Sequence, residues 1–407
     1  MRNMFFKTLL AGVFFSTYYS VRISSFYFTV SDGLFVVAFL GGVMSGVFSD
    51  LDFGDAKNHL VLWAIGVFLI VVGLLFSDLV NQPPPSRTLA TVSQYLFAYL
   101  FLPFLVMSLK SNVHIKKLLM GFAMGLGSVV AIGGCFYICF PSIYARLVEA
   151  GIFIMQVRLG SFIGPNGMAK TIAMTMPFIL FKFQDGESYK TSLLLFLVFV
   201  FGLIGAASIG GVFSTLLGII MYLILAPNRT SNLPKFISII LITVALFYCL
   251  NQSSYFSQSI IRSFRRVSIP ISERSLEAAG SSTEKIALAK EAVAKIAISP
   301  LIGIGSHQFV EKTNLMEPVH NTYLLLWVEG GLLSFIGILI IVFSAVSYAW
   351  RVYRKGKNKQ DITCASLVFT TSFVYATNLL TNTNSYSRFE ILPVILTMAL
   401  LARRERQ

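Results

Sequence analysis

The clearest chemical candidate in this sequence is a histidine at the edge of an apolar run. His320 and Asn321 lie in EPVHNTYLLLWVEGG, where a long connecting segment meets an apolar stretch. A neutral imidazole can take a proton from a hydroxyl, although a polar residue that merely faces the membrane interface is the alternative. Asn321 has the residue type of a helix N-cap. Glu329 lies deeper in the apolar run, where a carboxylate is costly and indicates a function or a buried partner.

A second kind of chemistry is offered by an arginine beside a turn. Arg158 belongs to VRLGSFIGPNGMAK at 157–170, where Pro165, Asn166 and several glycines predict a turn before the chain re-enters an apolar run. The planar guanidinium suits phosphate oxygens, so Arg158 is a candidate clamp for a phosphate or pyrophosphate. Pairing with lipid headgroups is the equal alternative.

A further set of cations lies in the long segment 252–319. Its arginines are Arg262, Arg265, Arg266 and Arg274. The segment holds eight Lys and Arg but also six Glu, so its net charge is only +2. The segment as a whole is therefore not expected to bind anions, and particular arginines would have to contact the ligand. Arg274 in ISERSL is the first candidate for such a contact.

Other common site patterns do not occur in the sequence. There is no P-loop, GxGxxG, HExxH or GxSxG, and no Cys pair with zinc-ligand spacing. The acidic stretch SDLDFGD at 49–55 is predicted to be a solvated turn on the inward side. The sequence therefore predicts neither a metal nor a cofactor.

The elements that must position these residues are membrane helices. Hydrophobic residues make up 56% of the chain, charged residues only 12%, and Phe occurs 37 times. A soluble domain is nearer one quarter charged. The net charge of +14 would suit nucleic acid in a soluble protein. Here basic residues flanking membrane spans explain it better, so no nucleic-acid partner is expected.

Apolar runs long enough to span a bilayer predict an all-α integral membrane protein with about 12 transmembrane helices. These runs lie near 5–21, 31–49, 59–78, 90–108, 118–140, 167–183, 191–209, 211–227, 236–251, 321–350, 362–382 and 388–402. The chain then divides into spans within 1–251, the long segment 252–319, and spans within 320–407.

The orientation follows from the basic residues. With the N-terminus inside, 18 of the 32 Lys and Arg fall on the inward side. Eight of the others belong to 252–319, which is too long for the positive-inside rule to count. The bias predicts that both termini are cytoplasmic and that 252–319 lies outside.

Within the long segment, residues 281–299 read as an amphipathic helix. Ile286, Ala289, Val293 and Ile296 recur at helical spacing, with charged residues including Lys285 on the other side. Pro300 and the following glycines should end the helix. It is expected to lie on the outer interface or to roof a cavity.

Taken together, the chain resembles the O-antigen ligase and O-antigen polymerase superfamily of bacterial envelope polysaccharide synthesis. Three stretches carry the resemblance in the right order: RLGSFIGPNGMAKT, AVAKIAISPLIGIGSHQF and PVHNTYLLLWVEGGLLSFIGIL. With the span count, they cover roughly residues 30–400.

The resemblance implies a GT-C-like helical fold in the bacterial inner membrane. It implies metal-independent transfer of a glycan from an undecaprenyl-diphosphate carrier to an acceptor glycan or to lipid A-core on the periplasmic side. Arg158 and Arg274 would bind the diphosphate, and His320 would orient or deprotonate the acceptor hydroxyl. Asn166, Asn321, Lys285, Arg265 and Glu329 would line the substrate site. A chain-length regulator is a further expected partner, besides membrane lipids.

The chain departs from the family pattern at two cations. Where many members have Ser-Arg-Gly, this chain has AASIGG at 206–211, with Ile209 in place of the arginine. Where many have an arginine opening the amphipathic helix, it has Lys285. The missing arginine weakly favours a polymerase, and the ligase is the alternative. A transporter or flippase is the more distant one, because polar residues gather at one outer face rather than near the midplane.

Overall fold

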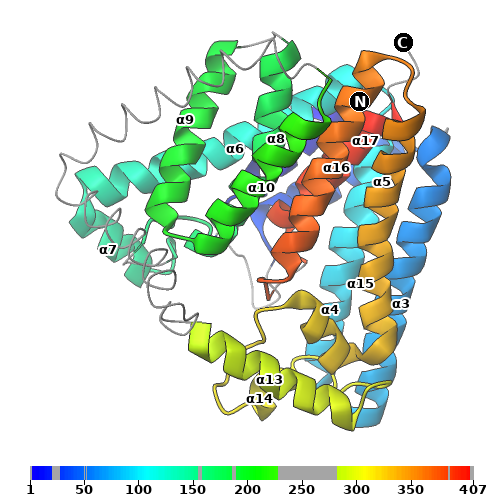
Figure 1. Ribbon diagram of the computed structural model, residues 1–407, viewed down its shortest axis with the longest axis vertical. Helices are drawn as coiled ribbons and strands as arrows, with labels where there is room; N and C mark the ends of the chain where they lie inside the picture. Colours follow the sequence, from blue (N-terminus) through cyan, green and yellow to red (C-terminus); the bar gives the residue numbers. More distant parts are fainter. Residues whose placement is uncertain are drawn as a thin grey trace.

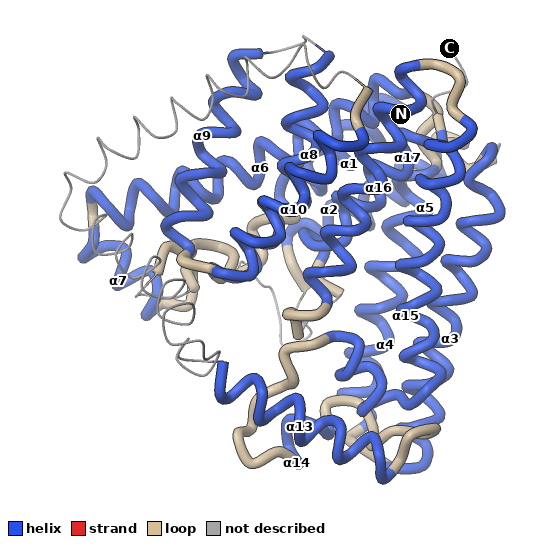
Figure 2. Tube along the Cα trace, in the orientation of Figure 1, coloured by secondary structure: helices blue, strands red, loops and turns tan. Residues whose placement is uncertain are grey.

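The computed structural model describes residues 2–20, 28–49, 51, 53–154, 158–185, 189–227, 282–383 and 386–403. The span expected at 236–251 and the candidate residues Arg262, Arg265, Arg266 and Arg274 lie outside the described residues. Figure 2 shows that the described chain consists almost entirely of helices joined by loops.

The helices follow the predicted apolar runs closely (Figure 1). They are α1 (Arg2–Phe15), α2 (Val30–Met44), α3 (Lys57–Asn81), α4 (Pro85–Leu96), α5 (Leu102–Met107), α6 (Asn112–Cys139), α7 (Pro141–Glu149), α8 (Pro165–Asp185), α9 (Tyr189–Ala206), α10 (Ile209–Leu225), α13 (Ser282–Ile298), α14 (Gln308–Lys312), α15 (Thr322–Lys355), α16 (Lys359–Leu379) and α17 (Arg388–Ala402). A short π-helical stretch, Phe97–Phe101, joins α4 to α5.

Six of the described helical stretches are long and apolar enough to cross a membrane. They are Gly54–Asn81, Pro85–Met107, Asn112–Cys139, Tyr189–Ala206, Thr322–Lys355 and Lys359–Leu379, and α2 and α10 are shorter apolar helices. Large apolar side chains such as Phe68, Leu79 and Phe213 are exposed on α3 and α10. Such a surface suits lipid rather than water. The prediction of an all-helical membrane protein is confirmed, whereas the number 12 stays a prediction.

The longest helix, α15, is held by close packing against α3. A Cβ atom at Gly66 would lie 2.7 Å from the Gly337 carbonyl oxygen, and one at Gly73 would lie 2.7 Å from the Gly330 carbonyl oxygen. Small residues allow such close approach, as is common between membrane helices. The Ser334 hydroxyl also donates to the Ile70 carbonyl at 3.0 Å. The packing against α3 thus holds the start of α15 in place.

Near its beginning, α15 bends at Gly331, whose φ of 68° lies in the left-handed region. The loop after α13 packs into this bend, because the Leu332 N–H donates to the Leu301 carbonyl at 3.2 Å and the Gly305 N–H donates to the Glu329 carbonyl at 3.0 Å. A Cβ atom at position 331 would lie 2.2 Å from the Leu301 oxygen. The bend therefore requires glycine.

The amphipathic helix predicted at 281–299 is present as α13, and it ends before Pro300 as expected. Its buried face differs from the prediction. Leu288, Ala292 and Ile296 pack with residues of α14 and α15, whereas Val293 is 54% exposed. The sequence STEKIALAKEAVAKIAI places apolar residues on more than one face. Periodicity alone does not determine which of these faces is buried. Contacts with α14 and α15 determine it.

The ends of the helices form two opposite faces of the molecule. The chain termini lie at the end where α15 and α17 finish, and α13 lies at the other end (Figure 1). The beginnings of α8, α15 and α17 and the end of α16 all belong to the α13 end. The candidate residues within the described part of the chain that begin or precede these helices, Asn166, His320 and Asn321, therefore lie at this end.

Candidate functional site

The residues around His320 are fixed by the capped start of α15. The Asn321 side chain accepts a hydrogen bond from the Leu324 N–H at 3.1 Å, as expected for an N-cap. The Thr322 hydroxyl donates to the Asn382 carbonyl at 3.0 Å, and the Tyr323 hydroxyl donates to the Ala376 carbonyl at 3.1 Å. His320 is thus held beside the end of α16 and the loop that follows it.

The same loop receives a buried lysine from α8. The Lys170 ammonium donates to the Thr381 carbonyl, and the Asn378 side chain donates to the Lys170 carbonyl at 3.3 Å. Only 4% of Lys170 is exposed. A buried ammonium needs hydrogen bonds and an opposite charge to be tolerated.

The opposite charge is Glu390 in the first turn of α17. It is also 4% exposed, it interacts electrostatically with Lys170, and it accepts a hydrogen bond from the Asn382 amide. Sequence reasoning missed both Lys170 and Glu390. The available signal was an isolated charge inside an apolar run, which by default marks a function or a buried partner.

His320 shares this environment with two lysines. Burial first, and then the positive charges of Lys285 and Lys170, lower the pKa of His320 to about 4. Among the described carboxylates, Glu317 comes within 4.0 Å of its Nε2 atom. The imidazole is therefore neutral at pH 7 and has a nitrogen available to accept a proton.

Arg158 and Asn166, both predicted site residues, are brought together. The Arg158 Nη1 atom donates to Asn166 Oδ1 at 3.1 Å. The arginine's segment is fixed by the Tyr144 hydroxyl, which accepts from the Gly160 N–H at 3.1 Å and lies 2.9 Å from the Gly160 carbonyl oxygen. Asn166 and Lys170 are four residues apart, so they share a face of α8. The guanidinium thus lies on the face of α8 that leads to Lys170.

The stretch 206–211, in which Ile209 stands where the resemblance implies an arginine, lies beside the Lys170 site. The Leu159 N–H donates to the Gly205 carbonyl at 2.9 Å. A Cβ atom at Gly211 would lie 2.3 Å from Ala169 Cβ, and one at Gly210 would lie 3.7 Å from Thr381 Oγ1. Lys170 donates to the carbonyl of that same threonine. The Lys170 ammonium is therefore near position 209, where this chain has the uncharged Ile209.

Glu329 has different partners from His320. Its buried carboxylate accepts hydrogen bonds from the backbone N–H groups of His307 and Phe309, and its carbonyl accepts from the Ser77 hydroxyl at 2.7 Å. The neighbouring Asp78 carboxylate accepts from the Ser306 N–H at 2.6 Å. These contacts hold the loop between α13 and α14. The structure thus gives Glu329 contacts with this loop, and His320 is not among the described partners of its carboxylate.

Among the described residues, no group of three or more His, Cys, Asp and Glu side chains could hold a metal ion. The charges that act on His320 are mainly positive, namely those of Lys285 and Lys170. Such a group is suited to bind an anion with phosphate oxygens.

Fold and site together define a helical membrane protein with a cationic site at one end of its helices. Residues 194–342 match the family model for O-antigen ligase. This region includes α10, α13, His320 and most of α15, and the match confirms the resemblance to the O-antigen ligase and O-antigen polymerase superfamily. It supports a membrane enzyme of this ligase or polymerase type. No curated protein matches the chain.

Proposed function

We propose that the protein is a glycosyltransferase that moves a glycan from an undecaprenyl-diphosphate carrier to a hydroxyl of an acceptor glycan. The observation that carries this proposal is the neutral His320 beside Lys170 and Lys285, at a point where four helices begin or end. An imidazole beside cations offers a proton acceptor and an anion site together, which are the two groups that this reaction needs.

On the donor side, Lys170, Lys285 and Arg158 bind the diphosphate. As the acceptor oxygen forms its bond to the anomeric carbon, the bond from that carbon to the phosphate oxygen breaks, and negative charge collects on the leaving diphosphate. Fixed cations stabilise this charge. Lys170 supplies charge where Ile209 replaces the family arginine, because its ammonium is next to Thr381. Arg274 and Arg265 remain candidates for the same role.

On the acceptor side, His320 takes the proton of the attacking hydroxyl. The lysines that lower its pKa are the groups that would bind the diphosphate. A bound diphosphate offsets their charge, so it raises the pKa of His320 and makes the imidazole a stronger base. Binding of the donor therefore increases the basicity of His320 before the proton is transferred. Asn166, Asn321 and Glu329 position the segments around the site.

We favour a polymerase, which joins repeat units carried on two lipids, over a ligase that attaches the finished polymer to lipid A-core. The reason is the missing arginine at position 209. In either case the α13 end faces the periplasm, the termini are cytoplasmic, and the membrane is the bacterial inner membrane. The basic segment 351–360 supports this orientation. A chain-length regulator is the expected protein partner.

The test compares two histidines of the same outer segment. His320→Asn and His307→Asn are expressed in a strain that lacks this gene, and surface polysaccharide is resolved on gels with protein quantified by blot. His307 is a matched control, because burial and Arg87 also lower its pKa. Its φ of 59° is one that asparagine tolerates.

His320→Asn should abolish surface polymer at unchanged protein level, and His307→Asn should not. Single repeat units on lipid A-core would indicate a polymerase, and bare core with polymer left on the carrier would indicate a ligase. Normal polymer with His320→Asn would remove His320 from the reaction and with it the proposed mechanism.

A further inference from the structure

The turn that follows α13 has two exposed apolar side chains on a well-held backbone. Ile298, the last residue of α13, is 83% exposed, and Leu301 is 66% exposed. The Leu332 N–H donates to the Leu301 carbonyl at 3.2 Å, and the Asn81 amide donates to the Gly303 carbonyl at 3.2 Å. The exposed pair is therefore fixed beside the end of α3 and the bend of α15 (Figure 1). Single exposed apolar residues are common, but a continuous apolar surface indicates an interaction.

The exposed apolar surface of α3 ends at this turn. Its large side chains recur at helical spacing, namely Val61, Ile65, Phe68, Leu75, Phe76, Leu79 and Val80. From the first to the last of them the helix rises about 28 Å, which is close to the roughly 30 Å of hydrocarbon in a bilayer. Asn81, which donates to the turn, is the next residue. The boundary of the hydrocarbon at the α13 end therefore falls at the level of the turn.

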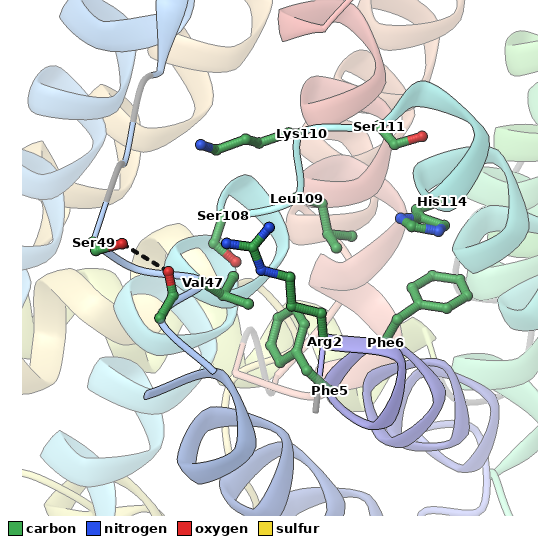
Figure 3. A pocket seen from close by; sticks show the side chains of 11 residues that line it. Arg2, Phe5, Phe6, Val47, Ser49, Ser108, Leu109, Lys110, Ser111 and His114 are labelled. Atoms are coloured by element: carbon green, nitrogen blue, oxygen red, sulfur yellow. Dashed lines mark hydrogen bonds between the residues drawn. The ribbon is translucent and has the colours of Figure 1, made fainter. Parts of the chain in front are cut away.

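The opposite boundary is marked by basic residues at the end where the chain termini lie. Figure 3 shows Arg2, Lys110 and His114 around a cavity of about 380 Å³ there. A second cavity at the same end, about 650 Å³ in volume, is lined by Lys57, at the start of α3, and by Arg351. Such basic residues lie outside the hydrocarbon. The hydrocarbon is therefore not displaced toward this end, and the apolar surface of α3 up to its last turn is needed to span it.

The exposed apolar surface of α15 leads to the same turn. Leu333, Ile336, Leu339 and Phe343 come after the bend at spacings of three or four, and all four are exposed. The N–H that donates to the Leu301 carbonyl belongs to the residue directly before Leu333. Leu301 therefore lies at the end of this surface, as it does at the end of the surface of α3.

An aromatic side chain typical of membrane interfaces also contacts the turn. The Trp327 Nε1 donates to the Pro300 carbonyl at 2.9 Å, and its ring stacks on that of Phe335 with ring centres 4.6 Å apart. Tryptophan is enriched where hydrocarbon meets water, because its ring is apolar and its N–H needs a hydrogen-bond partner. The position of Trp327 supports the same level for the boundary.

We infer that the turn Ile298–Leu301 is a membrane anchor, whose two apolar side chains enter the hydrocarbon of the leaflet at the α13 end. Its partner is the acyl chains of the bulk phospholipid, because the lipid-facing surfaces of α3 and α15 continue into it. The anchor holds the end of α13 at the membrane, and with it the helix that contains Lys285. It does not depend on the transfer reaction.

The test places a nitroxide spin label at single cysteines of the full chain, in which the four native cysteines are replaced by alanine. The chain is reconstituted in vesicles of phosphatidylethanolamine and phosphatidylglycerol. Labels at Ile298→Cys and Leu301→Cys are compared with one at Phe68→Cys, on the lipid-facing surface of α3. The matched control is Val293→Cys, which is also exposed on α13 but lies on another face of the helix, five residues before Ile298. Oxygen enters hydrocarbon, whereas a polar nickel complex stays in water.

The ratio of oxygen to nickel accessibility at positions 298 and 301 should exceed the ratio at 293 about tenfold or more, as it should at 68. A ratio at 301 equal to that at 293 would place the turn in water and overturn the anchor. Low accessibility of 301 to both reagents would show that protein covers it, and would overturn the anchor too. A ratio at 293 as high as at 68 would place all of α13 in the membrane, against an anchor restricted to the turn.

A second measurement tests whether Leu301 holds the turn in the membrane. With the label at position 298, Leu301→Asp introduces a charge at the expected hydrocarbon boundary, so the ratio at 298 should fall about fivefold. Val293→Asp, the matched control, should change it less than about twofold. Size exclusion checks that the variants are folded, which is expected because both altered side chains are exposed. An unchanged ratio with Leu301→Asp would contradict the anchor.

Discussion

Two buried charges stand two residues apart at the start of α17, and their surroundings differ sharply. Arg388, 2% exposed, donates from Nε and Nη2 to the Asp32 carboxylate at 2.8 and 3.0 Å, donates to Gln94, and lies 5.0 Å from the centre of the Phe97 ring. Asp32 also accepts from the Thr29 N–H at 2.9 Å. These contacts use the planar fork of the guanidinium fully.

Glu390 is buried to a similar degree but faces a different set of groups. It shares its surroundings with Lys170, Asn382 and, through the lysine, His320. An ammonium has three donors, and the Lys170 hydrogen bond in the described structure goes to Thr381. Burial is therefore similar at the two charges, and the hydrogen bonds of the two cations differ. Under the proposed function, Arg388 is structural and Lys170 acts on the substrate.

The largest expected effect is loss of the Arg388 clamp. Arg388→Met leaves the Asp32 carboxylate buried without its partner, which should cost about 3–5 kcal/mol of stability. The amount of folded protein in membranes should therefore fall severely, as measured by blot and by fluorescence-detected size exclusion. If Arg388→Met accumulated normally and lost only activity, the division between the two charges would be wrong.

Lys170→Met should have a slightly smaller effect, mainly on activity, although it also removes the opposite charge of the buried Glu390 and should lower stability in part. We expect transfer to fall about 10²–10³-fold, because a cation that stabilises the leaving diphosphate is removed. Transfer is measured in membranes with lipid-linked glycan. Lys170→Arg should recover part of it, since the charge is kept. A drop in folded protein that accounts for all lost activity would make Lys170 a second structural clamp.

The pH dependence should distinguish His320 from an ordinary histidine. Because its pKa is lowered to about 4 in the protein without donor, the imidazole stays neutral as pH falls from 7 to 5.5. The kcat/KM for the donor, which reports the free enzyme, should therefore change less than about twofold. An unperturbed histidine near pKa 6.5 would lose about tenfold over that interval. Loss of activity with an apparent pKa near 6.5 would contradict the proposed surroundings of His320.

The same lowered pKa has a consequence for stability. The unfolded chain protonates this histidine first as pH falls, so the folded state loses stability from about pH 6.5 down to about pH 4. In Lys170→Met, one of the charges that lowers the pKa is absent. The activity of that variant should therefore begin to fall at a higher pH than that of the unaltered protein.

The smallest expected effect concerns the cap of α15. Asn321→Ala removes the hydrogen bond to the Leu324 N–H and should cost about 1 kcal/mol. Asn321→Asp keeps an acceptor and serves as the control. Thermal unfolding in detergent measures both. A loss of activity far larger than the loss of stability would show that Asn321 touches the substrate.

The sequence predicted the helices better than it predicted the site. Apolar runs and the turn signals around Pro165, Pro300 and Asn321 placed most helix ends within a few residues, because lipid forces backbone hydrogen bonds into helices. The end of α1 and the start of α6 come six residues earlier than predicted. Lys170 and Glu390 were missed because their pairing joins α8 to α17 across 220 positions of the chain. Periodicity within one helix contains no information about such a contact.

The face of α13 was predicted only in part for a related reason. Its alanines make several stripes equally apolar, so the choice of Leu288, Ala292 and Ile296 depends on Phe309, Val319 and Val328, which come later in the chain. Arg158 and Asn166 were both candidates from the sequence, because they belong to one stretch, 157–170, although their hydrogen bond was not predicted. Local chemistry was visible in the sequence, and chemistry assembled between helices was not.

The bend at Gly331 also affects where His320 lies relative to the membrane. A straight helix of the 34 residues of α15 would be about 51 Å long, far more than the roughly 30 Å of hydrocarbon in a bilayer. The part after Gly331, about 36 Å at 1.5 Å per residue, is enough to cross it. The first turns of α15, about 14 Å of helix, lie beyond the bend. His320 would meet its substrates at the level of the headgroups, and a carrier could present its diphosphate there without withdrawing its tail from the lipid.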